Sequence, residues 1–178
     1  MDSNHCAATM IEKDVVVIGA GISGLVTAKC LKDDGFDVVM LERSGDIGGL
    51  WTYREDDYGV MKFTHINVSK YNYAFSDFPF PDDVPDFPHN KDMCKYIHDY
   101  AEHFKLSKLV QYHFMVTSIE QIGEKWRVTG KQSKPGSQGE GQEVTYVSQF
   151  VAISTGHHAK PTWPKIKGQE SFPGRWYF

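Results

Sequence analysis

Six residues near the start of the chain constrain its fold more than any other feature. Residues 19–24 read Gly-Ala-Gly-Ile-Ser-Gly, the pattern Gly-x-Gly-x-x-Gly. A β-branched run at residues 14–18 precedes them, and the apolar positions that follow recur at helical spacing. A strand, a glycine-rich turn and a helix in this order predict the first unit of a dinucleotide-binding α/β fold.

Each position of the motif has a physical role in the predicted site. Gly19 would adopt the backbone angles of a tight turn, and Gly21 would leave room for a pyrophosphate against the main chain. Gly24 would allow the helix and the strand to pack closely. Ile22 and Ser23 would begin the helix, whose N-terminal amides and positive dipole end favour phosphate groups.

A carboxylate strengthens this interpretation. Asp33, Asp34 and Gly35 are expected to end the helix, and residues 38–41 form a second apolar strand. Glu42 follows that strand, at the place where an acid accepts hydrogen bonds from ribose hydroxyls. An acid there disfavours a 2′-phosphate, so this site should take FAD or NAD and not NADP. The alternative, a glycine-rich turn that only packs a helix, explains the glycines but not the acid.

The sequence after residue 44 predicts long loops, one helix and several strands. Residues 45–89 are rich in glycine, proline, aspartate and aromatic residues without a period, which predicts long loops that serve a site. Asn90 is a plausible N-cap for a helix with one apolar face, formed by Met93, Tyr96, Ile97, Tyr100, Ala101 and Phe104. Strands are expected at residues 112–122, 125–129 and 144–155, with residues 130–142 as an exposed hairpin tip.

These elements predict an α/β fold, a partial doubly wound (Rossmann-like) parallel sheet with a β-hairpin insertion. Residues 1–12 are expected to form a disordered tail, and residues 13–178 a dinucleotide-binding domain. A resemblance to a known family, carried by residues 42–51, implies that this is an incomplete FAD-binding domain.

Composition excludes several other functions. The chain of 178 residues has a formal net charge of −4 and therefore lacks the basic field of a nucleic-acid binder. Cys6, Cys30 and Cys94 are widely spaced and odd in number, which fits neither a disulfide framework nor a zinc site and favours a reducing, intracellular compartment. His157 and His158 lack a metal-ligand spacing, so no metal site is expected.

The segment after the second strand resembles a known family. Residues 42–44 (Glu-Arg-Ser) and 46–51 (Asp-Ile-Gly-Gly-Leu-Trp) resemble the second FAD fingerprint of the flavin-containing monooxygenases and of the related Baeyer–Villiger and N-hydroxylating monooxygenases. This resemblance favours FAD over NAD. It implies that the backbone of Gly48 and Gly49 lies close to the flavin pyrophosphate, and that Arg43, Leu50 and Trp51 line the sites of the adenine and the flavin. The alternative for Trp51 is a core aromatic side chain.

A longer stretch of the sequence distinguishes between these related families. Residues 63–70 and 75–83 look specifically like the flavin-containing monooxygenases, and the Arg-Tyr-Pro-Gly block typical of Baeyer–Villiger enzymes is missing from the sequence. The resemblance implies that Asn67 faces the flavin and acts as the catalytic residue that helps to hold the oxygenated intermediate. Its alternative is an asparagine that caps a loop. Residues 154–156, with Thr155 and Gly156, resemble the turn that brings backbone near FAD in this family.

The resemblance implies a FAD-dependent, NADPH-using monooxygenase that oxygenates nitrogen or sulfur nucleophiles of small molecules with O2. No second Gly-x-Gly-x-x-Gly unit follows Gly156, so the NADPH site is expected to lie outside this chain, and Phe178 stands where a family signature has histidine. Two alternatives stay open: a Baeyer–Villiger or N-hydroxylating monooxygenase, or a catalytically inactive, truncated FAD-binding module. The expected location is intracellular, in the cytoplasm or on the cytoplasmic face of the endoplasmic reticulum, with membrane association undetermined.

Overall fold

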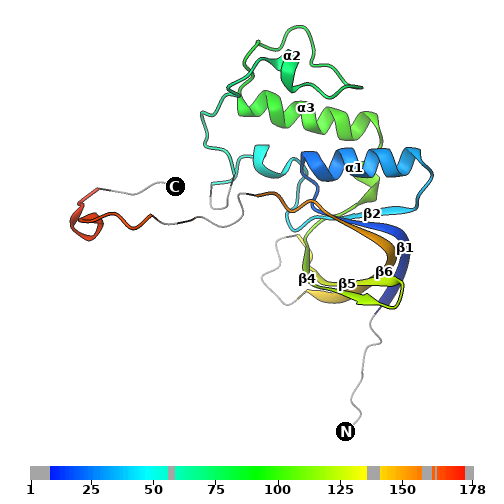
Figure 1. Ribbon diagram of the computed structural model, residues 1–178. Coiled ribbons are helices and arrows are strands. Elements are labelled where there is room, and N and C mark those ends of the chain that lie inside the picture. The colour runs from blue at the N-terminus through cyan, green and yellow to red at the C-terminus, as the bar shows by residue number, and fades with distance from the viewer. Residues whose placement is uncertain (1–8, 56–58, 136–140, 158–161, 163, 175–178) are drawn as a thin grey trace.

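A computed structural model describes residues 9–55, 59–135, 141–157, 162 and 164–174 (Figure 1). The predicted tail at residues 1–8, the tip of the predicted hairpin, His158 and Phe178 lie outside these described residues. In chain order the elements are β1 (Thr9–Ile18), α1 (Ile22–Asp33), β2 (Val38–Leu41), the 3-10 helix η1 (Gly49–Trp51), α2 (Lys70–Tyr73), α3 (Asn90–His103), the 3-10 helix η2 (Ser107–Leu109), β3 (Val110–Gln111), β4 (Phe114–Ile122), β5 (Lys125–Gln132), β6 (Gln142–Ile153) and the 3-10 helix η3 (Gln169–Ser171).

The strands form one sheet in the order β3-β2-β1-β6-β5-β4. β3, β2, β1 and β6 are parallel, whereas β5 pairs antiparallel with both β6 and β4. The predicted α/β class, with a parallel core and a β-hairpin insertion, is confirmed. In the described chain α1 and α3 lie on one side of the parallel strands, and the antiparallel strands curl under the other (Figure 1). The second covering layer is therefore made of strands.

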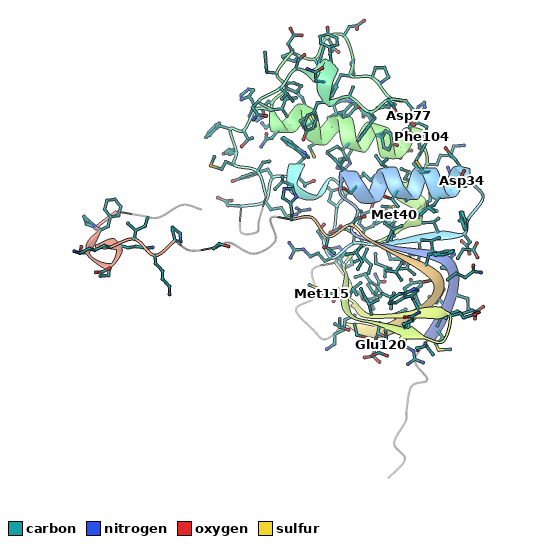
Figure 2. The ribbon with its side chains drawn as sticks, viewed as in Figure 1. Asp34, Met40, Asp77, Phe104, Met115 and Glu120 are labelled. Atoms are coloured by element: carbon teal, nitrogen blue, oxygen red, sulfur yellow. The ribbon has the colours of Figure 1, made fainter. Side chains whose placement is uncertain are left out.

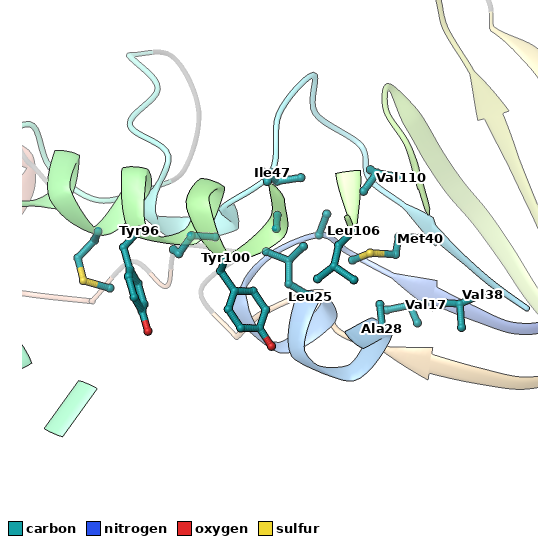
Figure 3. Packing of buried hydrophobic residues seen from close by; sticks show 14 of the residues in the cluster. Val17, Leu25, Ala28, Val38, Met40, Ile47, Tyr96, Tyr100, Leu106 and Val110 are labelled. Atoms are coloured by element: carbon teal, nitrogen blue, oxygen red, sulfur yellow. The ribbon is translucent and has the colours of Figure 1, made fainter. Parts of the chain in front are cut away.

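Two apolar cores follow from this arrangement, because successive side chains of a strand point to opposite faces. Val17, Val38 and Met40 form one core with residues of α1 and α3, and Figure 3 shows Val17 and Val38 beside Ala28 of α1. The opposite face of the same strands packs against β4, β5 and β6 through Val16, Ile18, Val39, Leu41, Phe114, Val128 and Tyr146. Figure 2 shows Met40 on the helical side and Glu120 on β4 at the other side.

The predicted boundary of the first strand was wrong. β1 begins at Thr9, because residues 9–13 pair in register with residues 144–148 of β6. Residues 9–12 therefore belong to the sheet and not to a tail. Residues 9–12 (Thr-Met-Ile-Glu) show no alternation of polar and apolar residues that would signal a strand, and their extended backbone depends on pairing with β6.

The predicted N-cap of α3 was also wrong by one residue. His89 is the N-cap: its Nδ1 accepts a hydrogen bond from the Lys91 amide at 3.1 Å, and Asp92 Oδ2 accepts one from the His89 amide at 3.1 Å. Asn90 is buried, and its Nδ2 donates to the Met61 carbonyl at 3.0 Å. The predicted apolar face is confirmed, because its members are buried or, for Phe104, partly buried against the core.

The bounds of the three antiparallel strands differ from their predictions. β4 begins at Phe114 and not at residue 112, β5 extends to Gln132 and not only to residue 129, and β6 begins at Gln142 and ends at Ile153 instead of running over residues 144–155. Antiparallel pairing between residues 130–132 and 142–144 explains the extension, because these polar residues have no strand pattern of their own. No helix in the described part of the chain is long and apolar enough to cross a membrane.

Candidate functional site

The loops that follow β1, β2 and β6 meet at the carboxyl ends of these parallel strands. They enclose a cavity of about 340 Å³, a size typical of small-molecule sites. The crevice at the carboxyl ends of the strands is where open α/β sheets bind ligands. Most of the predicted cofactor-contacting residues line it: Gly19, Gly21, Ile22, Ser23, Glu42, Arg43, Gly49, Leu50, Trp51, Thr155 and Gly156.

The glycine-rich turn lies against two other loops. Gly19 has a φ of 101°, and a Cβ there would overlap the Ser154 carbonyl oxygen of the turn after β6. Gly21 faces the second fingerprint, because a Cβ built on Gly49 would lie 3.0 Å from the Gly21 Cα. Gly24 does not line the cavity; a Cβ there would overlap the Gly19 carbonyl oxygen. It has the packing role predicted from its position in the motif.

The N-terminus of α1 opens toward the cavity. Its N-cap is Gly21, which supplies no capping side chain, and its first turn carries no acidic residue. Ile22 and Ser23 of that turn line the cavity. Because the first amides of a helix lack acceptors within the helix, this end offers donors and a positive dipole to an anionic group.

Glu42 is buried, and its carboxylate is held at the end of β2. Its Oε2 accepts a hydrogen bond from the Ala20 amide and its Oε1 accepts one from the Ser44 amide, both at 2.8 Å. The carboxylate therefore fixes the glycine-rich turn, a role that the sequence did not indicate. A carboxylate has about four lone-pair sites, so Glu42 retains acceptor capacity toward the cavity that it lines.

The second fingerprint forms η1 and the loop before it. Thr52 Oγ1 donates to the Ile47 carbonyl at 2.6 Å and closes this loop. Trp51 packs edge-to-face on Tyr73, with ring centroids 5.9 Å apart, and both side chains line the cavity. Trp51 also packs against the helical core, as the core interpretation predicted. Its contact with a flavin stays a prediction.

The short helix α2, which carries Tyr73, is anchored by a buried lysine. Lys70 Nζ donates to the carbonyls of Pro81, Asp82 and Val84 at 3.2, 3.1 and 2.5 Å. Three acceptors for one ammonium offset the cost of burying its charge. Lys70 thereby holds α2 to the following loop.

Several cavity residues were missed by sequence reasoning. Phe114, Met115 and Val116 of β4 line the cavity, together with Tyr73 and His157. The residues of β4 come close because the antiparallel strands curl under the parallel ones, and no local pattern signals that curl. Gly48 and Ser154, which the family resemblance had placed near FAD, also line the cavity.

Asn67 is exposed on the segment before α2 and does not line the cavity. The structure does not bring it together with the other predicted site residues. Its catalytic role, which came from the resemblance alone, stays a prediction.

Burial affects the ionisation of two groups near the site. Burial raises the pKa of the Tyr112 phenol, and the charges of Asp46 and Glu42 raise it further, so this phenol is neutral at neutral pH. Burial also raises the pKa of the Cys94 thiol, whose Sγ lies 3.8 Å from Thr52 Oγ1. Among the described residues there is no group of three or more His, Cys, Asp or Glu side chains that could hold a metal ion.

Comparison with known protein families agrees with this geometry. The model of the flavin-binding monooxygenase-like (FMO-like) family matches residues 12–178. The chain belongs to this family. As an FMO-like chain, it carries its glycine-rich turn, its acid and its second fingerprint around one cavity.

Curated relatives include monooxygenases from mammals. The FMO-like chain is 36% identical over 179 residues to flavin-containing monooxygenase 5 of Rattus norvegicus, with 94% of this chain and 32% of the relative covered. It is 36% identical over 176 residues to dimethylaniline monooxygenase [N-oxide-forming] 2 of Mus musculus, with 93% and 32% covered. The chain therefore spans about a third of the length of the curated relatives it matches.

Solved structures show the same fold. S-allyl-L-cysteine S-oxygenase from Allium sativum superposes with a TM-score of 0.81 at 25% identity, covering 93% of this FMO-like chain and 41% of that one. A complex of the protein OTEMO with FAD and NADP superposes with a TM-score of 0.68 at 22% identity, covering 90% and 29%. At that identity the second likeness shows the fold alone.

Proposed function

We propose that the cavity binds FAD. The observation that carries this proposal is the close approach of Gly21 and Gly49 at the N-terminus of α1, beside the buried carboxylate of Glu42. Two backbones without side chains leave a cradle that a Cβ would fill, and the adjacent helix end favours phosphate. Membership of a flavin-binding family supports the same assignment.

The residues that would hold each part of FAD follow from their chemistry. Amides of Gly21, Ile22 and Ser23 would donate to the pyrophosphate, and Glu42 would accept from ribose hydroxyls. The aromatic side chains of Trp51 and Tyr73 give the cavity an apolar wall for a flat ring. Bound FAD would supply the redox chemistry by which O2 is activated. The protein would supply position and exclusion of water.

For the whole protein we propose NADPH-dependent oxygenation of a nitrogen or sulfur nucleophile in a small molecule, with O2 as the oxidant. The printed names of two similar proteins, a dimethylaniline monooxygenase that forms N-oxides and an S-allyl-L-cysteine S-oxygenase, support this substrate class. We also propose an intracellular location, because the described cysteines, Cys30 and Cys94, are free thiols.

For the 178-residue chain taken alone, we propose FAD binding without oxygenation. The described residues form one cavity of this chemistry, and it carries the acid that disfavours a 2′-phosphate. FAD binding is therefore the part of the proposed function that we expect of the 178-residue chain alone.

The test is a titration of the purified chain with FAD, FMN and NADPH, followed by flavin and tryptophan fluorescence. FAD should bind, and FMN and NADPH should bind far more weakly, because they lack the adenosine end or carry a 2′-phosphate. At a hundredfold excess over Kd, FAD should raise Tm by about 5–10 °C. Equal affinity for all three nucleotides, or no binding of FAD, would contradict the proposal.

A further inference from the structure

Arg54 lies outside the cavity lining but contacts the loop that forms its wall. One guanidinium nitrogen, Nη1, donates to the Gly49 carbonyl at 3.1 Å and to the Thr52 carbonyl at 3.4 Å. The other, Nη2, donates to Ser44 Oγ at 3.0 Å. The planar guanidinium thus joins Gly49 to Ser44 across the second fingerprint. Its donors have a fixed, forked geometry that suits two such acceptors.

Ser44 continues this chain of contacts toward Glu42. Its Oγ lies 2.8 Å from Glu42 Oε1 and 2.7 Å from the Asp46 carbonyl, and its amide donates to Glu42 Oε1 at 2.8 Å. A hydroxyl has one proton, so Ser44 Oγ can donate to only one of these oxygens at a time. The lone pairs of Oγ remain to accept the charged donor from Arg54, which makes that hydrogen bond stronger than a neutral one.

The last link reaches the glycine-rich turn. Glu42 Oε2 accepts the Ala20 amide at 2.8 Å, and Gly21 follows Ala20 directly. We propose that Arg54 is a positioning residue that couples the two cavity loops through Ser44 and Glu42 and so sets the gap between Gly49 and Gly21. The proposal rests on the proposed function in one respect, because it takes FAD as the ligand that fits the gap between Gly49 and Gly21.

The physical consequence of losing Arg54 follows from its contacts. The Gly49 carbonyl would lose its side-chain donor, and Ser44 would lose the charged partner that fixes its hydroxyl. Glu42 would then be held less firmly, and with it the Ala20 amide. Arg54 does not line the cavity, so its contacts can affect FAD affinity only through these residues, whereas its charge also acts through space and is retained in Arg54→Lys.

Hydrogen–deuterium exchange of the FAD-free chain tests the coupling without reference to the ligand. In Arg54→Met, amides of residues 19–24 and 44–52 should exchange about tenfold faster than in the wild type, since a lost charge-assisted hydrogen bond is worth about that factor. Arg54→Lys should recover part of the protection. Arg127→Met is the matched control, because Arg127 forms an exposed contact with Glu120 at 3.6 Å on the antiparallel strands. Unchanged exchange at residues 19–24 in Arg54→Met would overturn the proposal.

FAD titration of the same variants tests the route of the effect. Arg54→Met should weaken FAD affinity about tenfold in the wild-type background and by a clearly smaller factor in a Ser44→Ala background, because the link through Ser44 is then already broken and only the direct contact with the Gly49 carbonyl is left to lose. Equal weakening in both backgrounds would overturn the route through Ser44. If the wild type fails to bind FAD while exchange still responds to Arg54→Met, the proposed function fails and the coupling stands.

Discussion

At the scale of single residues, the three glycines of the first motif are glycines for different reasons. Gly19 has a positive φ and lies against the Ser154 carbonyl, and Gly24 lies against the Gly19 carbonyl. Both are therefore needed for the fold. Gly21 has ordinary backbone angles, with φ −78° and ψ −173°, and a Cβ there would meet Gly49 at 3.6 Å, an ordinary contact distance. The fold can therefore accept a side chain at Gly21, and the proposed pyrophosphate contact is the reason we give for its glycine.

This distinction gives the first prediction. Gly21→Ala should keep Tm within about 1 °C but weaken FAD affinity about tenfold or more, because its methyl group enters the proposed pyrophosphate cradle. Gly21→Asp should abolish binding, since its charge repels phosphate. Gly24→Ala should lower the free energy of unfolding by about 1–3 kcal/mol through overpacking. Thermal denaturation and FAD titration of the variants separate the two effects, and a large loss of Tm in Gly21→Ala would contradict this reading.

Asn67 gives a second prediction at this scale. Its side chain is exposed and outside the cavity, so Asn67→Ala should leave the FAD affinity of the 178-residue chain within about twofold of wild type. In a longer chain that performs oxygenation, the role that family resemblance implies for Asn67 predicts that Asn67→Ala slows oxygenation by about ten- to a hundredfold. Product formation at the wild-type rate would remove Asn67 from the site.

At the scale of elements, α3 organises the aromatic loop that precedes it. Tyr96 stacks on Phe80 with centroids 3.7 Å apart and also packs on Phe75 and Phe78. Its hydroxyl accepts the Phe75 amide at 2.8 Å and donates to the Phe78 carbonyl. The apolar face of one helix thus fixes the path of a loop that has no regular structure of its own.

The third prediction follows from these two hydrogen bonds. Tyr96→Phe keeps the ring stacking but leaves a backbone amide and a carbonyl without their partner, so the free energy of unfolding should fall by about 1–3 kcal/mol. Urea denaturation measures it. Tyr53→Phe, at an exposed tyrosine, is the control and should change stability by less than about 0.5 kcal/mol. Equal losses in both variants would show that the hydroxyl of Tyr96 has no special role.

A fourth prediction concerns pH. Lys29 Nζ lies 2.8 Å from Asp77 Oδ2 and joins α1 to the same aromatic loop, and this hydrogen bond lowers the pKa of Asp77 below its ordinary value of 3.8. A lowered folded-state pKa stabilises the protein above pH 3.8, and this stability is lost as the pH falls through the folded value. Asp77→Asn should lower Tm at neutral pH by about 1–3 °C, since the pair is partly exposed.

The acid range provides the check on that prediction. The difference in Tm between Asp77→Asn and wild type should shrink as the pH falls below 3.8, because the wild-type carboxyl then becomes protonated. Asp83→Asn, on an exposed part of the same loop region, is the control. A difference that does not vary with pH would mean that the carboxylate charge contributes nothing.

At the scale of the whole molecule, one sheet brings three distant turns to one cavity. β1, β2 and β6 end side by side, so residues near 20, 42 and 155 meet although more than a hundred positions separate the first from the last. β4 closes the cavity from the other side of the sheet. The site therefore exists only when the long β1–β6 pairing has formed.

The fifth prediction is that the 178-residue chain, saturated with FAD, shows no NADPH-dependent oxygenation of a tertiary amine or thioether. The cavity among the described residues carries the Glu42 carboxylate, which repels a 2′-phosphate, and FAD would already fill it. NADPH oxidation is followed by absorbance and product by mass spectrometry. Substrate-dependent product above the background of free flavin would show that the chain forms a nicotinamide site as well.

Features that depend on local chemistry could be predicted from the sequence. Apart from the start of β1, the strand, the glycine-rich turn, the helix and the acid lie where the pattern predicted them, because backbone freedom, periodicity and charge act within about thirty residues, while their contacts with a dinucleotide stay a prediction. Family resemblance added the second fingerprint and the turn with Thr155 and Gly156. All of the residues assigned to cofactor binding except Gly24 and Asn67 line the cavity.

Contacts between distant segments, in contrast, could be identified only in the folded chain. The start of β1 at Thr9 is set by its partner β6, and β4 reaches the cavity because the antiparallel strands curl under the sheet. The links from Arg54 through Ser44 to Glu42 likewise depend on how a loop folds back on itself. No local pattern encodes such contacts, because their energy appears only when the chain has brought both partners together.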